Sequence, residues 1–144
     1  MKTLHFTIRI EAPRQVVWDT MLSLETYRQW TAAFCEGSYY EGSWEEGAAI
    51  RFLGPSGEGM RAVIAENVHL QRISIRHLDC FTKDKEEPVT DPAFENYTFR
   101  DVPGGTELLV DMDSPEPYEA MFQEMWPRAL QLLKALCENS QPSS

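Results

Sequence analysis

The longest amphipathic pattern in the chain lies near its C-terminus, in the stretch SPEPYEAMFQEMWPRALQLLKALCE at residues 114–138. Apolar residues recur there at intervals of three and four, which places them on one face of a helix with 3.6 residues per turn. The members of this face are Tyr118, Phe122, Met125, Ala129, Leu132, Leu133 and Leu136. Ser114 suits the N-cap and Pro115 the first turn. The pattern predicts one long helix, which Pro127 would either kink near Gln123 or break into two segments.

Most of the chain before this helix has the two-residue period of strands. Residues 4–10 alternate apolar and polar side chains, and two short helices are expected next, at 14–21 and 24–30. Glycines then punctuate short strand-like runs, a pattern typical of successive hairpins. The further strands are predicted at 38–44, 48–53, 60–68, 71–81, 93–101 and 106–113. The polar stretch KDKEEPVTDP at 83–92 is predicted to be an exposed loop.

Composition narrows the class of protein. A chain of 144 residues with 42% hydrophobic and 25% charged residues fits one soluble globular domain, which we place at residues 1–140 with a short polar tail at 141–144. No run approaches the ~18 apolar residues of a membrane span, so we expect no membrane insertion. The net charge of −10 disfavours nucleic-acid binding.

Cysteine and leader patterns favour a cytoplasmic location. The N-terminus shows no secretory signal pattern. Cys35, Cys80 and Cys137 lie far apart without paired spacing, which indicates no disulfide framework. The three histidines form no ligand cluster with them, so we expect no metal and no cofactor.

The order strand, two short helices, about six strands and long helix resembles the START/Bet v-type helix-grip superfamily (SRPBCC). Within it, the chain is similar to the bacterial homologues of the heat-shock ATPase activator, also called polyketide-cyclase-like. The stretches that carry the resemblance are EAPRQVVWDTML, YRQWTAAF, YTFRDVPGGTELLV and MWPRALQLLKAL. The resemblance implies an α+β helix-grip fold. In it, a curved antiparallel sheet of about six to seven strands wraps around the C-terminal helix, with two short helices after the first strand.

In this superfamily the sheet and the helix usually enclose a cavity, although the periodicity alone would equally allow a solid core. The inward faces would line such a cavity and bind its ligand. The residues expected there are Tyr40, Phe52, Ile64, Ile75, His77, Tyr97, Phe99, Met121, Met125 and Leu133. Tyr97 would need a hydrogen-bond partner if buried. Each of these residues is also compatible with an ordinary core.

Candidate catalytic groups are few. His77 shares a face with Ile73 and Ile75, where an imidazole could act as a general base or could be a satisfied core residue. Glu95 and Asp79 could approach the interior of the sheet, but neither has a neighbour that defines a role. The GPSGEGM stretch at 54–60 does not open a helix, which argues against phosphate binding.

Three functions remain open because the superfamily includes carriers, cyclases, hydrolases and cochaperone domains. The leading hypothesis is the binding of an apolar or amphipathic small molecule between sheet and helix, without covalent chemistry. The second is a cyclase- or hydrolase-type enzyme that uses His77 or Tyr97 as acid or base. The third is a cochaperone-like interaction domain with a chaperone partner. An exposed edge strand would also allow a homodimer.

Overall fold

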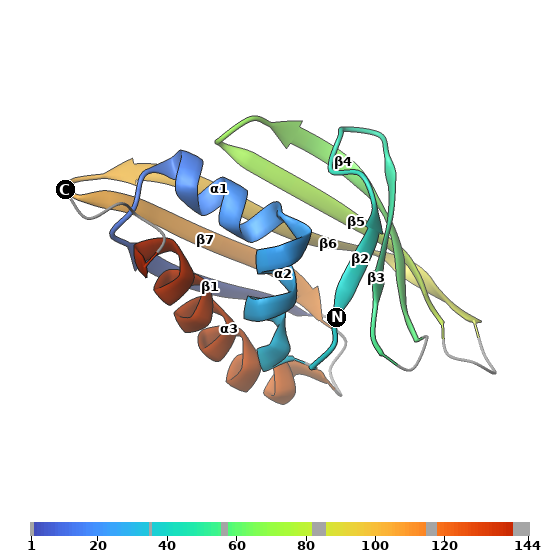
Figure 1. Ribbon diagram of the computed structural model, residues 1–144. Coiled ribbons are helices and arrows are strands. Elements are labelled where there is room, and N and C mark those ends of the chain that lie inside the picture. The colour runs from blue at the N-terminus through green and yellow to red at the C-terminus, as the bar shows by residue number, and fades with distance from the viewer. Residues whose placement is uncertain (1, 35, 56–57, 82–85, 115–117, 140–144) are drawn as a thin grey trace.

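The fold is one antiparallel sheet covered on one side by three helices and a short 3₁₀ turn (Figure 1). The computed structural model describes residues 2–34, 36–55, 58–81, 86–114 and 118–139. In chain order the elements are β1 (Lys2–Ile10), α1 (Arg14–Leu22), α2 (Leu24–Trp30), η1 (Thr31–Ala33), β2 (Tyr39–Gly42), β3 (Ala49–Leu53), β4 (Gly59–Val68), β5 (Arg72–Phe81), β6 (Glu86–Val102), β7 (Gly105–Ser114) and α3 (Glu119–Asn139). The predicted α+β helix-grip fold is confirmed.

The strand order in the sheet is β1-β7-β6-β5-β4-β3-β2, with every neighbouring pair antiparallel. From β2 to β7 the chain therefore moves one strand at a time across the sheet, as short hairpins require. Only β1 pairs out of sequence, with β7, and this places the start of the chain beside its last strand. The helices α1 and α2 cross the concave side, and α3 lies beside β1 (Figure 1).

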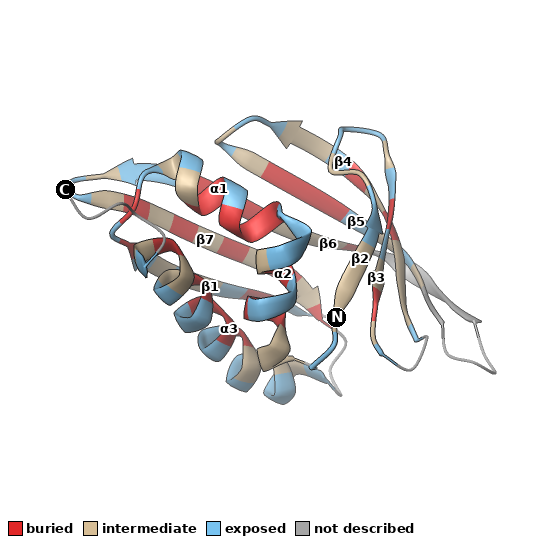
Figure 2. Ribbon diagram, viewed as in Figure 1, coloured by how far each residue is buried: buried red, intermediate tan, exposed pale blue. Residues whose placement is uncertain are grey.

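The core lies between the concave face and the helices, where Figure 2 shows most of the buried residues. The alternation is cleanest in β7, where Thr106, Leu108, Val110 and Met112 are buried and the intervening residues are not. Side chains of a strand point alternately to opposite faces, so this pattern assigns one face to the core. Each large apolar side chain that is fully buried contributes about 1.5–3 kcal/mol to stability.

The α3 helix begins later and buries a different face than the sequence pattern predicted. It starts at Glu119, whereas Ser114 is the last residue of β7 and Pro115 lies outside the described residues. The helix continues through Pro127, which excludes a break into two segments. The residues that it buries are Trp126, Ala129, Leu130, Leu133 and Cys137. Tyr118 and Leu132, predicted to face inward, are 53% and 42% exposed.

The predicted loop at 83–92 is wrong from Glu86 onward, because β6 begins there; residues 83–85 lie outside the described residues. The backbone of Glu86 pairs with Phe81, and that of Pro88 pairs with Asp79. The two strands shift register between His77 and Asp79. This part of the hairpin projects beyond the helices (Figure 1), so strand pairing there does not require an apolar face toward a core.

Candidate functional site

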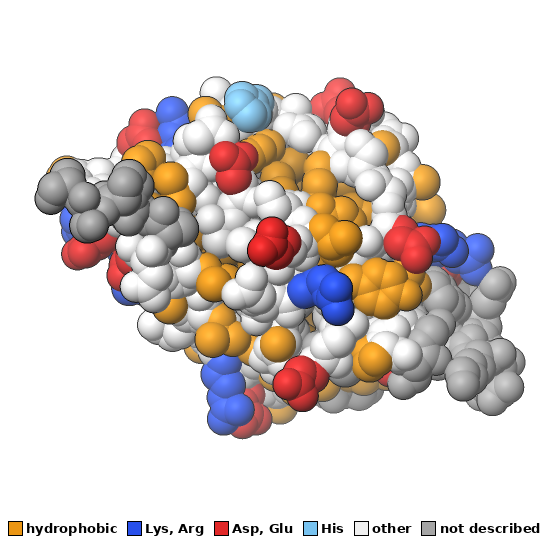
Figure 3. Space-filling view, viewed as in Figure 1, with side chains coloured by type: hydrophobic (Ala, Val, Ile, Leu, Met, Phe, Trp, Pro, Cys, Tyr) orange, Lys and Arg blue, Asp and Glu red, His pale blue; other side chains and the backbone are white. Residues whose placement is uncertain are grey.

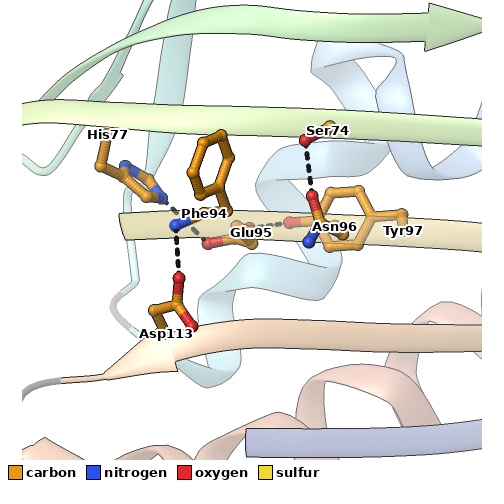
Figure 4. Close-up of polar contacts among 7 residues, drawn as sticks. All are labelled: Ser74, His77, Phe94, Glu95, Asn96, Tyr97 and Asp113. Atoms are coloured by element: carbon orange, nitrogen blue, oxygen red, sulfur yellow. Dashed lines mark hydrogen bonds and ion pairs between the residues drawn. The ribbon is translucent and has the colours of Figure 1, made fainter. Parts of the chain in front are cut away.

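Three polar side chains meet on the concave face of the sheet, at adjacent positions of β5 and β6 (Figure 4). His77 follows Ile73 and Ile75 along the inward face of β5, as the two-residue period predicted. On β6, Glu95 pairs with Ile75 and Tyr97 pairs with Ile73. We call His77, Glu95 and Tyr97 the polar cluster.

Glu95 is the centre of the polar cluster. The Tyr97 hydroxyl donates a hydrogen bond to Glu95 Oε2, and His77 Nε2 lies 3.4 Å from Glu95 Oε1. The side chains of His77 and Glu95 are only 10% and 16% exposed. A polar group removed from water to this extent costs free energy unless its hydrogen bonds are replaced. The cluster therefore satisfies Glu95 and Tyr97 through each other.

A series of aromatic rings in mutual contact borders the cluster. We call this set the aromatic wall, and its members are Tyr27, Trp30, Phe34, Tyr40, Trp44, Phe52 and Trp126. The ring of Phe52 lies 6.1 Å from that of His77, and the ring of Trp126 lies 6.1 Å from that of Tyr97. The wall thus joins β2 and β3 through α2 to α3, and it contacts the polar cluster at both ends.

Tyr27 shows how far the wall excludes water. Burial is the main cause that raises the pKa of Tyr27, and the nearby Glu95 carboxylate and Tyr40 raise it further. The Tyr27 phenol therefore stays protonated and neutral across the physiological range. Tyr40 is anchored differently, because its hydroxyl donates to the backbone carbonyl of Leu22 at 2.5 Å.

Two buried polar atoms in this region have no hydrogen-bond partner among the described residues. They are His77 Nδ1, in the polar cluster, and Trp126 Nε1, in the aromatic wall. Such groups are rare in native proteins, and each costs about 1–3 kcal/mol when left unsatisfied. Both lie between the sheet and the helices, which is where the superfamily resemblance implies a ligand.

Two pockets of the described surface lie at the rim of the fold, away from the polar cluster. One, of about 230 Å³, is lined by Trp18, Asp19, Leu22, Ser23, Trp44, Asn67 and His69. Figure 3 shows hydrophobic side chains gathered on this side, between α1 and the strands β2 to β4. The other, of about 430 Å³, includes Arg14, Arg72 and Arg100 in its lining.

The predicted ligand-binding residues divide by burial. Ile64, Ile75, Tyr97, Phe99 and Leu133 are buried in the core. Tyr40, Phe52, His77 and Met125 are half-buried. Met121 is 38% exposed, which differs from the expectation that it faces inward.

Phe99 belongs to another part of the core than the polar cluster. Its ring lies 5.1 Å from the ring of Trp18 on α1, away from the contacts of His77 and Glu95. Of the predicted residues, the structure connects Tyr40, Phe52, His77 and Tyr97. The first two both contact the ring of Tyr27, and Phe52 also lies beside His77. His77 and Tyr97 are joined through Glu95.

Three residues of the site were not identified as such from the sequence. Glu95 was noted without a partner, although its spacing of two from Tyr97 places both on one face of β6. Tyr27 and Trp126 were absent from the predicted lining, because the face that a helix turns toward a sheet depends on packing. The sequence signal that could have identified Glu95 is its spacing of two residues from Tyr97, which was expected to be buried and to need a hydrogen-bond partner.

Metal binding has no candidate in the described part of the chain, where no three His, Cys, Asp or Glu side chains group closely enough to hold an ion. Nor does any helix there have the length and apolarity that crossing a membrane requires.

Comparison with known proteins gives a family and a fold. Residues 11–138 match the family model described as "Activator of Hsp90 ATPase homolog 1-like protein". A comparison with the curated proteins found no match.

Three solved structures illustrate the likeness in fold. Protein MLL2253 from Mesorhizobium loti has a TM-score of 0.79 at 12% identity, over 98% of this chain and 100% of that one. An AHSA1-like protein from Aeromonas hydrophila has a TM-score of 0.69 at 15% identity, over 99% of both chains. CalU16 from Micromonospora echinospora has a TM-score of 0.67 at 17% identity, over 98% of this chain and 76% of that one.

Proposed function

We propose, from the premise that this chain belongs to the family of activator of Hsp90 ATPase homolog 1-like proteins, that it binds an apolar or amphipathic small molecule. The ligand would lie between the concave face and the helices, against the polar cluster and the aromatic wall. The observation that carries the proposal is a largely buried His–Glu–Tyr cluster, bordered by aromatic rings, in which a nitrogen of His77 has no hydrogen-bond partner among the described residues. A pocket with apolar walls and a few oriented polar groups is the usual form of a small-molecule site.

Burying the polar cluster costs free energy of folding, which is explained if the cluster binds a ligand. Apolar side chains would fill the same space without desolvating a carboxylate, and buried ionic groups often stabilise less than their apolar replacements. Trp126 adds a second unsatisfied group in the same layer. A ligand with polar atoms would satisfy these groups on binding, so the free energy lost in the unliganded fold would contribute to affinity.

A ligand would reach the site past the side chains of the aromatic wall. Phe34, at the end of η1, is half-buried, and its ring contacts that of Trp126 at 5.0 Å. We infer that a ligand would enter beside Phe34, whose ring borders Trp126.

A fluorescence titration with N-phenyl-1-naphthylamine, an apolar probe, tests the proposal. The probe should bind the wild-type chain, and His77→Trp should abolish binding by filling the space beside the cluster. The matched control is Arg76→Trp, since Arg76 is the neighbouring residue on the exposed face of β5. Circular dichroism checks that both variants fold, and His77→Phe is the milder filling variant. Equal binding by His77→Phe, Arg76→Trp and wild type would place the probe elsewhere and overturn the proposal.

A second candidate function, a cochaperone-like interaction domain, is favoured by the outer surface of α3. Met121 and Leu132 are exposed there, Met125 and Leu136 are half-buried, and the exposed Tyr118 directly precedes the helix. At about 100° per residue the four helical positions fall within an arc of roughly 60°, so they form one apolar stripe. Contiguous exposed apolar surface is a common feature of interaction sites.

The test of this alternative is a pull-down with a purified Hsp90-type ATPase. Leu132→Glu places a charge on the stripe and should abolish capture, while Gln131→Glu adds the same charge beside it and should not. Failure of the wild-type chain to capture the ATPase would exclude this function for that partner.

A further inference from the structure

The polar cluster indicates which kind of ligand the site would accept. The inference starts from His77, whose two ring nitrogens have different surroundings. Nε2 faces the Glu95 carboxylate at 3.4 Å, whereas Nδ1 is buried without a hydrogen-bond partner among the described residues (Figure 4). A neutral imidazole carries its proton on one nitrogen and a lone pair on the other. Which nitrogen bears the proton therefore decides what His77 can offer a ligand.

For the neutral imidazole, the contacts of Glu95 assign that proton to Nε2. A carboxylate only accepts hydrogen bonds, and the Tyr97 hydroxyl already donates to its second oxygen. An unprotonated Nε2 would bring a lone pair toward a carboxylate oxygen, which is repulsive. With the proton on Nε2, the buried Nδ1 carries the lone pair. His77 is then a hydrogen-bond acceptor for the ligand, and Glu95 and Tyr97 hold it in that tautomer.

The charge of the site excludes an anionic head group. The polar cluster and the aromatic wall contain one carboxylate, Glu95, and neither set includes a lysine or an arginine. A carboxylate or phosphate ligand would add a second negative charge in a region where Tyr27 is buried and neutral. Like charges in a desolvated site repel strongly, and beside a neutral His77 neither would have a cationic partner in these two sets. A neutral donor avoids this cost.

The walls favour a planar apolar body. Phe52 lies beside His77, and Tyr27 lies between Phe52 and Trp30 with ring separations of 6.2 and 5.4 Å. Aromatic rings at such separations contribute through offset and edge-to-face contacts. A flat ring system inserted beside His77 would continue this arrangement.

We propose that the ligand is a neutral, hydroxyl-bearing aromatic or similarly flat apolar molecule whose O–H donates to His77 Nδ1. The inference rests on the proposed ligand-binding function, and it deepens that function by naming the polar end of the ligand. In it, Glu95 and Tyr97 are positioning residues, because they fix the tautomer of His77 without contacting the ligand themselves.

A matched set of naphthalenes tests the inference by isothermal titration calorimetry. The probes are 2-naphthol, which can donate a hydrogen bond, 2-methoxynaphthalene, which cannot, and 2-naphthoate, which is anionic. We expect 2-naphthol to bind about tenfold more tightly than 2-methoxynaphthalene, equivalent to ~1.4 kcal/mol. We expect 2-naphthoate to bind most weakly.

Two variants separate the hydrogen bond from the general shape of the site. His77→Leu should remove the preference for 2-naphthol while both neutral probes still bind. His77→Asn keeps an oxygen acceptor near the position of Nδ1 and should retain part of the preference. In the wild-type chain, the ¹⁵N resonance of His77 Nδ1 should shift on addition of 2-naphthol and not on addition of 2-methoxynaphthalene. A purely structural role of His77 would not produce that difference.

The outcomes distinguish the inference from the function beneath it. Equal affinities for the two neutral probes, or tightest binding of 2-naphthoate, would overturn the hydroxyl assignment and leave small-molecule binding in place. Binding of none of the three naphthalenes would overturn both. A preference for 2-naphthol that persists in His77→Leu would assign the acceptor to another residue and contradict the role of Nδ1.

Discussion

Replacing the polar cluster by apolar side chains should leave the fold at least as stable as the wild type. The triple variant His77→Leu, Glu95→Met, Tyr97→Phe keeps the approximate volume of each side chain. It removes the desolvated carboxylate and the unpartnered Nδ1 together. Replacements of this kind are often neutral or stabilising by about 1–4 kcal/mol. We expect a free energy of unfolding within about 1 kcal/mol of wild type, or above it.

The single change Glu95→Met should behave in the opposite way. It leaves the Tyr97 hydroxyl and His77 Nε2 buried without their acceptor. Each of these two unsatisfied groups costs about 1–3 kcal/mol, so the single variant should lose roughly 2–6 kcal/mol. The contrast between single and triple variants measures how strongly the three side chains depend on one another.

Urea unfolding followed by far-ultraviolet circular dichroism gives both free energies. The control is Thr98→Val, on the opposite face of β6, which removes one hydrogen bond from Arg72 and should cost at most about 1.5 kcal/mol. The reasoning is refuted if the triple variant loses as much stability as the sum of its three single variants. The cluster would then stabilise the fold, and its presence would need no ligand.

Three further predictions concern the frame around the site. Burial raises the pKa of the Cys137 thiol to about 11 from 9.0. The contribution of this thiol to stability is therefore complete below pH 9 and is lost as the pH rises toward 11. Urea unfolding across this range should show that Cys137→Val loses less stability with rising pH than the wild type does. Leu133→Ala should cost about 2–5 kcal/mol and Leu132→Ala less than about 1 kcal/mol by the same assay, because only the first side chain is buried. A Cβ at Gly59 would collide with a backbone carbonyl of β3, whereas Gly54 has room for one, so thermal unfolding should show a lower Tm for Gly59→Ala and little change for Gly54→Ala.

The sequence pattern predicted the elements better than it predicted which side of them is buried. The α3 helix is an example, since Leu132 and Leu133 were assigned to one inward face and only Leu133 is buried. Apolar residues cover a wider arc of α3 than the sheet and the short helices contact. Periodicity locates the arc, but the curvature of the sheet decides which part of it faces the core.

The site was predicted in outline because His77 and Tyr97 lie in strands with clear alternation. Their connection through Glu95 could not be read from the sequence, since it depends on the register between β5 and β6. A shift of one residue would have moved Glu95 to the opposite face. Trp126 was missed for the reason that applies to α3 as a whole.

The most direct test of the account is a set of intermolecular nuclear Overhauser effects from bound N-phenyl-1-naphthylamine to methyl groups of the protein. If the probe lies against the polar cluster, its ring protons should contact the methyl groups of Ile75 and Leu133, which are buried between sheet and helix. Contacts confined to Leu22 or Val68 would place it in one of the two rim pockets, and contacts to Leu132 would place it on the outer stripe of α3. Contacts confined to Leu22, to Val68 or to Leu132 would each contradict a ligand site on the concave face.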